Sequence, residues 1–149
     1  SLGLLTLNAL SAAEKVLIPV QCEYYAMEGI ADLQRTITLV QNRINPKLRI
    51  GGIVLTMFDA RNNLSHQVQN EIRNHFKDAV FQVVIPRNVR LSEAPSHGKP
   101  ILLYDVSSKG AASYFDLANE VLGRDGFASE AEARMPVMGQ IAETEAKEF

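Results

Sequence analysis

The stretch IPRNVRLSEAPSHGKP, residues 85–100, follows a short apolar run and holds too much proline and too many polar residues for a strand or a helix. Pro86 and Pro95 each lack a backbone N–H group and disfavour the α conformation in the residue before them. The stretch carries three cations and one acid, namely Arg87, Arg90, Lys99 and Glu93. We therefore predict a long functional loop at the end of a strand, although a solvated connection without a role would have the same composition.

Strand-like and helix-like segments alternate on both sides of this loop. Short apolar runs indicate buried strands at residues 16–20, 50–57 and 80–85. Apolar residues spaced three or four apart indicate amphipathic helices at residues 27–44, 64–76 and 110–122, and Ser107 or Ser108 could cap the last of them. The alternation predicts an α/β fold with a mostly parallel sheet and flanking helices.

The first 20 residues are unusually apolar. Leucine and alanine recur at helical spacing through residues 1–13, which predicts a helix that is nearly all buried. The continuous run VLIPV at residues 16–20 predicts a strand covered on both faces. In such a sheet the ligand site is expected beyond the carboxyl ends of the strands, where three loops lie at residues 21–25, 58–63 and 86–100.

Composition excludes several classes of protein. The formal net charge of −2 does not suit a polycation that binds nucleic acid along its whole length. Cys22 is the only cysteine, so an internal disulfide or a cysteine-built metal site is impossible within one chain. No apolar run approaches the roughly 20 residues of a membrane span. Residues 124–149 hold six acids against three basic residues and lack an apolar period, so we predict an acidic, mobile tail.

The common nucleotide-binding motifs are missing from the sequence. A phosphate-binding loop reads G-x-x-x-x-G-K-[ST], but the only Gly-Lys pair, Gly98-Lys99, is followed by Pro100. No G-x-G-x-x-G dinucleotide fingerprint occurs. The three histidines are scattered and lack partners at metal-ligand spacing. From the residues alone, the chain is half of an α/β nucleotide-type domain without its phosphate site.

Three segments resemble the ParA/Soj family of chromosome- and plasmid-partitioning ATPases, and they read VLIPVQCEYYAMEG (16–29), DARNNLS (59–65) and IPRNVRLSEAPSHGKPILLYD (85–105). The resemblance covers residues 1 to about 123 and implies the C-terminal half of a deviant P-loop NTPase fold, with the P-loop half absent. Since the chain opens without methionine, inside an apolar pattern, we expect a fragment or a processed product. The predicted domains are therefore a C-terminal part of a ParA-type ATPase at 1–123 and the tail at 124–149, which matches no family feature.

The resemblance also implies partners and cofactors. The complete protein is expected to bind ATP and Mg²⁺, to form a nucleotide-sandwich homodimer and to bind double-stranded DNA without sequence preference. A ParB-type centromere-binding protein is the expected regulator, and the expected location is the bacterial cytoplasm at the nucleoid, with no membrane partner. The Mg²⁺ ligands and the phosphate-binding lysine would lie outside this chain, so we predict that it does not hydrolyse ATP alone.

Site residues follow from the same resemblance. It implies that the adenine end of the nucleotide is held by Met57, Phe58, Pro86, Arg87 and Asn88. It implies that Arg61 and Arg90 bind DNA, since they lie in the loops after two successive strands. Met57 and Phe58 could equally be core residues, and both arginines could be solvated surface charges.

Two alternatives stay open. The first is a stand-alone DNA-binding and dimerisation module without ATPase activity. The second is a related ATPase of the MinD type, but such proteins end in a basic amphipathic helix, whereas this tail is acidic. An iron protein of the nitrogenase type would need paired cysteines, which the single Cys22 cannot supply.

Overall fold

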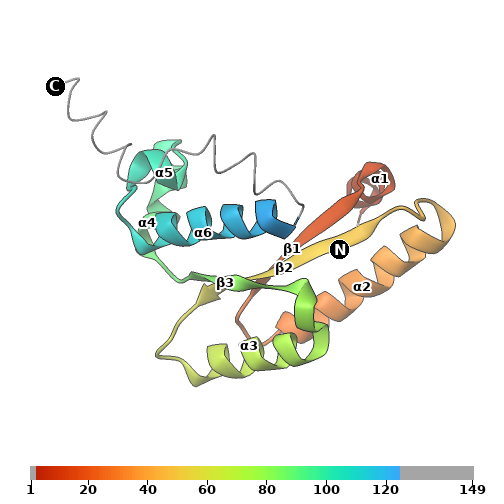
Figure 1. The fold of residues 1–149 in the computed structure, drawn as a ribbon, viewed down its shortest axis with the longest axis horizontal. Helices are drawn as coiled ribbons and strands as arrows, with labels where there is room; N and C mark the ends of the chain where they lie inside the picture. The colour runs from red at the N-terminus through yellow and green to blue at the C-terminus, as the bar shows by residue number, and fades with distance from the viewer. Residues whose placement is uncertain (1–2, 125–149) are drawn as a thin grey trace. The chain divides into compact units, whose positions relative to one another are not determined.

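Three parallel strands form the centre of the computed structural model, which describes residues 3–124 (Figure 1). The order across the sheet is β1 (Lys15–Gln21), β2 (Arg49–Phe58) and β3 (Val80–Pro86). Both neighbouring pairs are parallel, with Val20 opposite Leu55 and Phe58 opposite Pro86. The predicted α/β fold with a parallel sheet and flanking helices is thus confirmed.

Helices precede β1, connect the three strands and follow β3. The longer helices are α1 (Leu4–Ala12), α2 (Ala26–Arg43), α3 (Asn63–Phe76) and α6 (Lys109–Arg124). The shorter ones are η1 (Lys77–Ala79), α4 (Val89–Glu93), η2 (Ala94–His97) and α5 (Ile101–Tyr104). Contacts divide the chain into two units, Ser1–Leu117 and Ala118–Phe149, and the site lies in the first. The acidic tail was predicted at residues 124–149; Arg124 ends α6, and the rest of the tail lies outside the described residues.

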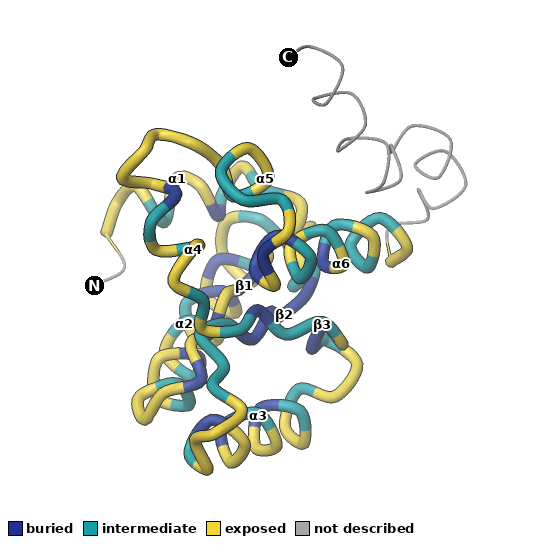
Figure 2. Tube along the Cα trace, turned by 90° about the vertical axis from the view of Figure 1, so that its left-hand side faces the viewer, coloured by how far each residue is buried: buried dark blue, intermediate teal, exposed yellow. Residues whose placement is uncertain are grey.

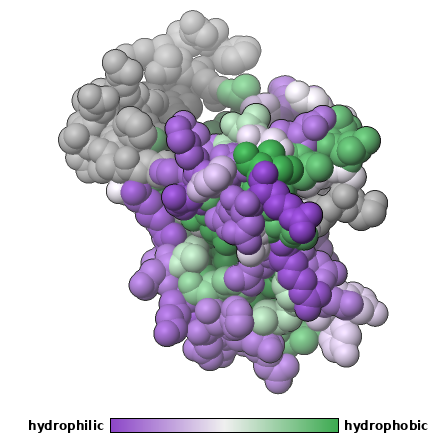
Figure 3. Space-filling model, turned by 90° about the vertical axis from the view of Figure 1, so that its right-hand side faces the viewer, coloured by the Kyte–Doolittle hydropathy of each residue, from purple (hydrophilic) through white to green (hydrophobic). Residues whose placement is uncertain are grey.

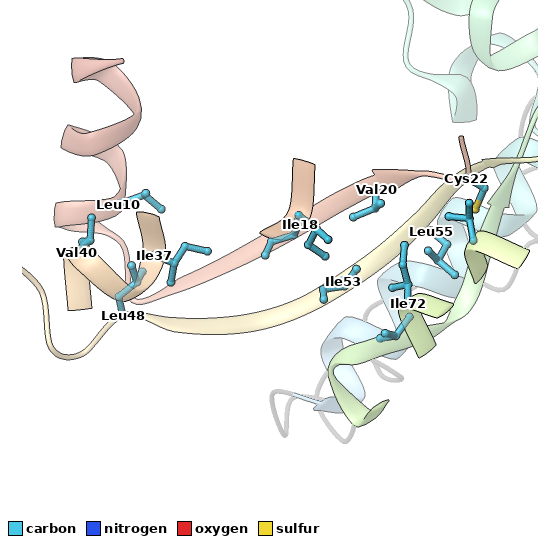
Figure 4. Close-up of a cluster of buried hydrophobic side chains, with 13 residues drawn as sticks. Leu10, Ile18, Val20, Cys22, Ile37, Val40, Leu48, Ile53, Leu55 and Ile72 are labelled. Carbon is cyan, nitrogen blue, oxygen red and sulfur yellow. The ribbon is translucent and has the colours of Figure 1, made fainter. Parts of the chain in front are cut away.

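The main core lies between the sheet and the pair α2 and α3, which cover one face of it (Figure 1). Figure 4 shows its side chains, and Ile37, Ile53, Leu55 and Ile72 are no more than 1% exposed. In Figure 2 the outer sides of α2 and α3 are exposed, whereas the middle of β2 is buried. The period-3.6 apolar pattern of the two helices therefore faces the sheet, as the sequence predicts.

The other face of the sheet has its own buried residues, namely Val54, Phe81, Ile85, Ala111 and Leu117. Gly52 is required in β2 because a Cβ atom there would collide with the ring of Phe81. The first turn of α6 begins at a cap, since the backbone N–H of Ala111 donates to Ser108 Oγ at 3.1 Å. Of the two serines considered from the sequence, Ser108 is therefore the cap.

Two predictions about the first 20 residues are wrong. Helix α1 buries only Leu10, and Leu4 and Leu5 are 80% and 85% exposed. Strand β1 alternates between buried and exposed residues, and Leu17 is 48% exposed. An apolar sequence indicates that a segment can be buried, but it does not show which other elements cover it. Within residues 3–124 only one side of β1 is covered.

The prediction of a long irregular loop at residues 85–100 is also wrong. Pro86 ends β3, and the segment then forms α4 and η2. Asn88 starts α4, since its Oδ1 accepts a hydrogen bond from the backbone N–H of Arg90 at 2.8 Å. Pro95 lies at the start of η2, where its missing N–H costs nothing, and Gly98 ends η2 with a φ of 62°. The residues that argued against a helix therefore mark the ends of short helices.

Candidate functional site

The segments that follow β1, β2 and β3 meet at one edge of the sheet. The backbone N–H of Arg87 donates to the carbonyl of Phe58 at 2.9 Å, which joins the ends of β3 and β2. The backbone N–H of Cys22 donates to the carbonyl of Thr56 at 2.9 Å, which joins the ends of β1 and β2. The parallel sheet thus brings together residues that are more than 60 positions apart in the sequence.

A polar cavity of about 420 Å³ opens at this edge. It is lined from all three strand ends by Cys22, Glu23, Tyr24, Met57, Asp59, Asn62, Leu64, Ser65 and Arg87. Met57 has a φ of 55°, a conformation that an unbranched side chain adopts only at a cost of order 1–3 kcal/mol. Such strain is concentrated at functional sites, which supports this edge as the candidate site.

An ion pair crosses the mouth of the cavity. Arg87 Nη2 donates to Glu23 Oε1 at 2.9 Å, and both side chains are about half exposed. The pair links the segment after β3 to the segment after β1. The sequence-based site residues do not include Glu23, and the signal that points to it is an acid within the short loop after a buried strand.

Arg61 projects from the turn between β2 and α3. Its side chain is 89% exposed, and its Nε and Nη2 donate to the two carboxylate oxygens of Asp59, each at 3.1 Å. These hydrogen bonds from Arg61 lower the pKa of Asp59 to about 2. Asp59 is a second cavity residue that sequence reasoning passed over.

Arg90 is held more firmly than Arg61. Within α4 and its surroundings, Arg90 Nη1 donates to Glu93 Oε2 at 2.9 Å and Arg90 Nε lies 3.2 Å from Asp105 Oδ2. The hydroxyl of Tyr104 also donates to Glu93 Oε2 at 3.0 Å, and the ring of Tyr104 stacks on His97. The hydrogen bond from Arg90, and then that from Tyr104, lowers the pKa of Glu93.

The five residues implied for adenine binding lie close together but have different surroundings. Met57 and Arg87 line the cavity. The ring of Phe58 packs against the core and makes an edge-to-face contact with His66 at 5.0 Å between centroids. Pro86 pairs with Phe58 in the sheet, and the side chain of Asn88 caps α4. Met57 and Arg87 are therefore the two that face open space.

Cys22 and Ser65 form the buried floor of the cavity. The hydroxyl of Ser65 donates to the carbonyl of Cys22 at 3.3 Å and accepts from the backbone N–H of Asp59 at 3.4 Å. Burial raises the pKa of the Cys22 thiol to about 11, so the thiol is neutral near pH 7. Both residues hold the ends of β1, β2 and α3 in place.

Residues 3–124 contain neither a cluster of metal-ligating side chains nor a helix suited to span a membrane. No three His, Cys, Asp or Glu side chains there come together as a metal site would require. None of the helices in this part of the chain combines the length and the apolar character needed to span a bilayer.

Several known proteins are similar to this chain in sequence or in fold. A family model described as an AAA domain matches residues 1–50. The chromosome partitioning protein ParA of Myxococcus xanthus is 62% identical over 125 residues, which is 84% of this chain and 44% of the relative. The sporulation initiation inhibitor protein Soj of Bacillus subtilis is 62% identical over 121 residues, which is 81% of this chain and 48% of the relative. The chain thus spans about half the length of the curated relatives that it matches.

A solved structure has the same fold. Cobyrinic acid a,c-diamide synthase from Mycobacterium smegmatis matches with a TM-score of 0.61 and 34% identity, over 80% of this chain and 42% of that one. The same enzyme has been solved with ADP and magnesium and with an ATP analogue and magnesium. Together with the strand-end sequences quoted above, these likenesses establish that the chain belongs to the ParA/Soj family of chromosome partitioning proteins.

Proposed function

We propose that this chain supplies the adenine-side wall and the DNA-contacting arginines of a ParA-type partitioning ATPase. The observation that carries the proposal is the edge of the sheet where a cavity lined by Met57 and Arg87 lies next to the projecting Arg61. The relatives' names support chromosome partitioning as the process. ATP binding, dimerisation and regulation by a ParB-type protein at the nucleoid are proposed for the complete ATPase.

The cavity suits a nucleobase better than a phosphate group. Met57 offers an apolar surface for a flat ring, and the carboxylates of Glu23 and Asp59 can accept hydrogen bonds from an exocyclic amine. The same carboxylates would repel a phosphate group, and Glu23 neutralises Arg87.

The guanidinium of Arg61 is proposed as the main DNA contact, and that of Arg90 is ranked second. The Arg61 guanidinium donates hydrogen bonds to both carboxylate oxygens of Asp59, and a guanidinium binds two phosphate oxygens in the same way. A DNA phosphate would therefore replace Asp59 as the partner of Arg61. Each phosphate contact releases counterions and contributes about 0.9 to the slope of log affinity against log salt. Two subunits in a dimer would double the contacts and strengthen a weak interaction.

The test uses a hybrid in which this chain replaces the matching part of the B. subtilis relative. Arg61→Ala is expected to weaken binding to duplexes of unrelated sequence and to reduce the salt slope by about 0.9 per lost contact. Arg90→Ala is measured beside it, and ATP-dependent dimerisation should persist in both variants. Arg35→Ala is the matched control, because Arg35 is 79% exposed and pairs with Asp32 on α2.

The proposal is wrong if Arg61→Ala and Arg90→Ala bind DNA as tightly as the parent at low salt. If both variants lose DNA only because they no longer dimerise, the arginines belong to the nucleotide-dependent interface. DNA binding by the 149-residue chain alone, with the same slope as the hybrid, would instead favour the stand-alone module.

A further inference from the structure

Every arginine in the segments directly after β2 and β3 pairs with a carboxylate of the same chain. The pairs have N–O distances from 2.9 to 3.2 Å, and they are Arg61 with Asp59, Arg87 with Glu23, and Arg90 with both Glu93 and Asp105. Three guanidinium groups thus face four carboxylates, so this set of side chains carries more negative than positive charge. A surface that binds a polyanion is expected to carry the opposite excess. The carboxylates therefore need an explanation that DNA contact alone does not supply.

The paired arginines follow the carboxyl ends of the strands, and the strands end on the side that faces the viewer in Figure 2. Figure 3 shows the opposite side, on which α1 lies in Figure 1, and there a hydrophobic area lies among polar residues. An apolar area offers no partner to a phosphate backbone, which is bound through positively charged and hydrogen-bonding groups. A duplex would therefore meet the side that holds the arginines together with their carboxylates.

The pair in the turn after β2 has the geometry of a competitor for phosphate. Arg61 Nε and Nη2 each lie 3.1 Å from one carboxylate oxygen of Asp59, so the donors that would hold two phosphate oxygens are already occupied. Asp59 Oδ1 also accepts from the backbone N–H of Arg61 at 3.0 Å, and the Asp59 side chain is only 25% exposed, whereas that of Arg61 is 89% exposed. The guanidinium can rotate away while the carboxylate stays, so a phosphate bound to Arg61 would lie beside a fixed negative charge.

Arg90 is occupied in the same way from two sides. Its Nη1 donates to Glu93 Oε2 at 2.9 Å, and its Nε lies 3.2 Å from Asp105 Oδ2. Both carboxylates are held by further hydrogen bonds, because the hydroxyl of Tyr104 donates to Glu93 at 3.0 Å and the hydroxyl of Ser107 donates to Asp105 Oδ1 at 2.8 Å. These carboxylates, too, would remain beside a phosphate that replaced them as partners of Arg90.

We propose that Asp59 competes with DNA phosphate for Arg61 and thereby sets how tightly a duplex is held. Glu93 and Asp105 act on Arg90 in the same way. This inference rests on the proposed DNA contact and adds the residues that limit its strength. The arginines make the contact with the duplex, whereas the fixed carboxylates keep that contact weak and readily reversed.

Protons do not relieve this competition near neutral pH. The hydrogen bonds from Arg61 lower the pKa of Asp59 to about 2. The hydrogen bond from Arg90, and then that from Tyr104, lowers the pKa of Glu93. Both carboxylates therefore stay ionised, and the competition is a constant property of the surface rather than a pH switch.

The test measures duplex binding by the hybrid with the B. subtilis relative, at an ATP concentration that saturates dimerisation of each protein. The proteins are the parent, Asp59→Asn, Arg61→Ala and the double variant. Asparagine keeps an oxygen that can accept from the backbone N–H of Arg61, but its amide donor does not attract the guanidinium, so the side chain of Arg61 is released.

Asp59→Asn is expected to bind duplexes of unrelated sequence roughly threefold more tightly at low salt, the size of a well-formed exposed ion pair. The gain should shrink at high salt, because screening weakens the repulsion between carboxylate and phosphate. In the Arg61→Ala background the gain should fall below about twofold, since no guanidinium is left to release. Asp32→Asn is the matched control, because it removes the same charge from an exposed pair with Arg35 on α2 and should leave duplex binding unchanged.

Unchanged or weaker duplex binding by Asp59→Asn, while Arg61→Ala still loses affinity, would overturn the inference, because Asp59 would then orient Arg61 for DNA instead of competing with it. The proposed DNA contact would stand in that case. An equal gain with and without Arg61 would also overturn the inference, because it would be a general effect of charge. If Arg61→Ala binds duplexes as tightly as the parent, the proposed function itself is contradicted, and this inference with it.

Discussion

Arg61 and Arg90 occupy equivalent places after two successive strands but have different electrostatic surroundings. Arg61 lies in a turn, 89% exposed, with Asp59 from the same turn as its carboxylate partner. Arg90 lies in α4, 54% exposed, between Glu93 and Asp105, and Tyr104 shares the Glu93 carboxylate. The first arginine projects into solvent, whereas the second ties α4 to the segment after α5.

The difference shows that position in a repeated strand–loop pattern does not fix the role of a side chain. An exposed guanidinium with one neighbour can move to a phosphate at little cost. A guanidinium between two carboxylates must leave both, and α4 loses a connection when it does. We therefore rank Arg61 above Arg90 as a DNA contact, and the following predictions test that ranking.

The largest expected effect concerns the packing beneath Arg90. A Cβ atom at Gly110 in α6 would lie 2.6 Å from Leu91 Cγ in α4, so in Gly110→Ala either the Leu91 side chain or the backbone of α4 must shift. Overpacking of this kind costs about 1–3 kcal/mol of the free energy of unfolding. Urea unfolding of the parent and the variant measures it. The turn that holds Arg61 should be unaffected, as seen from unchanged NMR shifts at residues 59–62.

The control for Gly110→Ala is Gly29→Ala in α2, where an added Cβ atom would meet nothing within 4 Å. Removing glycine from a helix interior should stabilise the chain by about 0.5–1 kcal/mol. If both variants gain stability, Leu91 moves aside freely and α4 is not held against α6.

A smaller effect is expected from the arginines themselves. Arg90→Gln should lower the urea midpoint, because it removes the contacts to Glu93 and Asp105 together. Arg61→Gln should lower the midpoint less, because Arg61 is 89% exposed and has one carboxylate partner. Equal midpoints for the two variants would show that Arg90 is no more structural than Arg61, and the ranking would fail.

The smallest effect is confined to one carboxyl group. The pKa of Asp59 is about 2 in the folded chain and 3.8 in the reference state, so its ionised form favours folding above pH 3.8, and this contribution is lost as the pH falls towards 2. NMR titration of the Asp59 carboxyl carbon should give the low value in the parent. In Arg61→Gln the pKa should rise towards 3.8, and an unchanged low value would mean that another group holds the charge.

The strands and longer helices could be predicted from the sequence because their apolar periods are set by local geometry. The α2 and α3 patterns place Ile37, Val40, Val68 and Ile72 in the core, and all are buried. The strand-end loops could likewise be identified, since the carboxyl ends of parallel strands share an edge. The family follows from long, specific sequence segments rather than from these patterns.

Other features depend on contacts that no local pattern reports. Asparagine and proline are common both in loops and at helix starts. The presence of Asn88 and Pro95 therefore did not distinguish the two, and α4 and η2 were not predicted. The pairing of Arg87 with Glu23 joins residues 64 positions apart. The bare side of β1 could not be predicted, because an apolar strand looks the same whether or not something covers it.

Pro19 has a consequence for how the chain behaves at high concentration. A strand at the edge of a sheet offers unpaired backbone groups on which further molecules can add in register and grow into fibrils. Proline supplies no N–H group, so an unbroken ladder of hydrogen bonds cannot extend along this part of β1. Association through the bare leucines is therefore expected to give amorphous, reversible clusters that redissolve on dilution, rather than ordered amyloid.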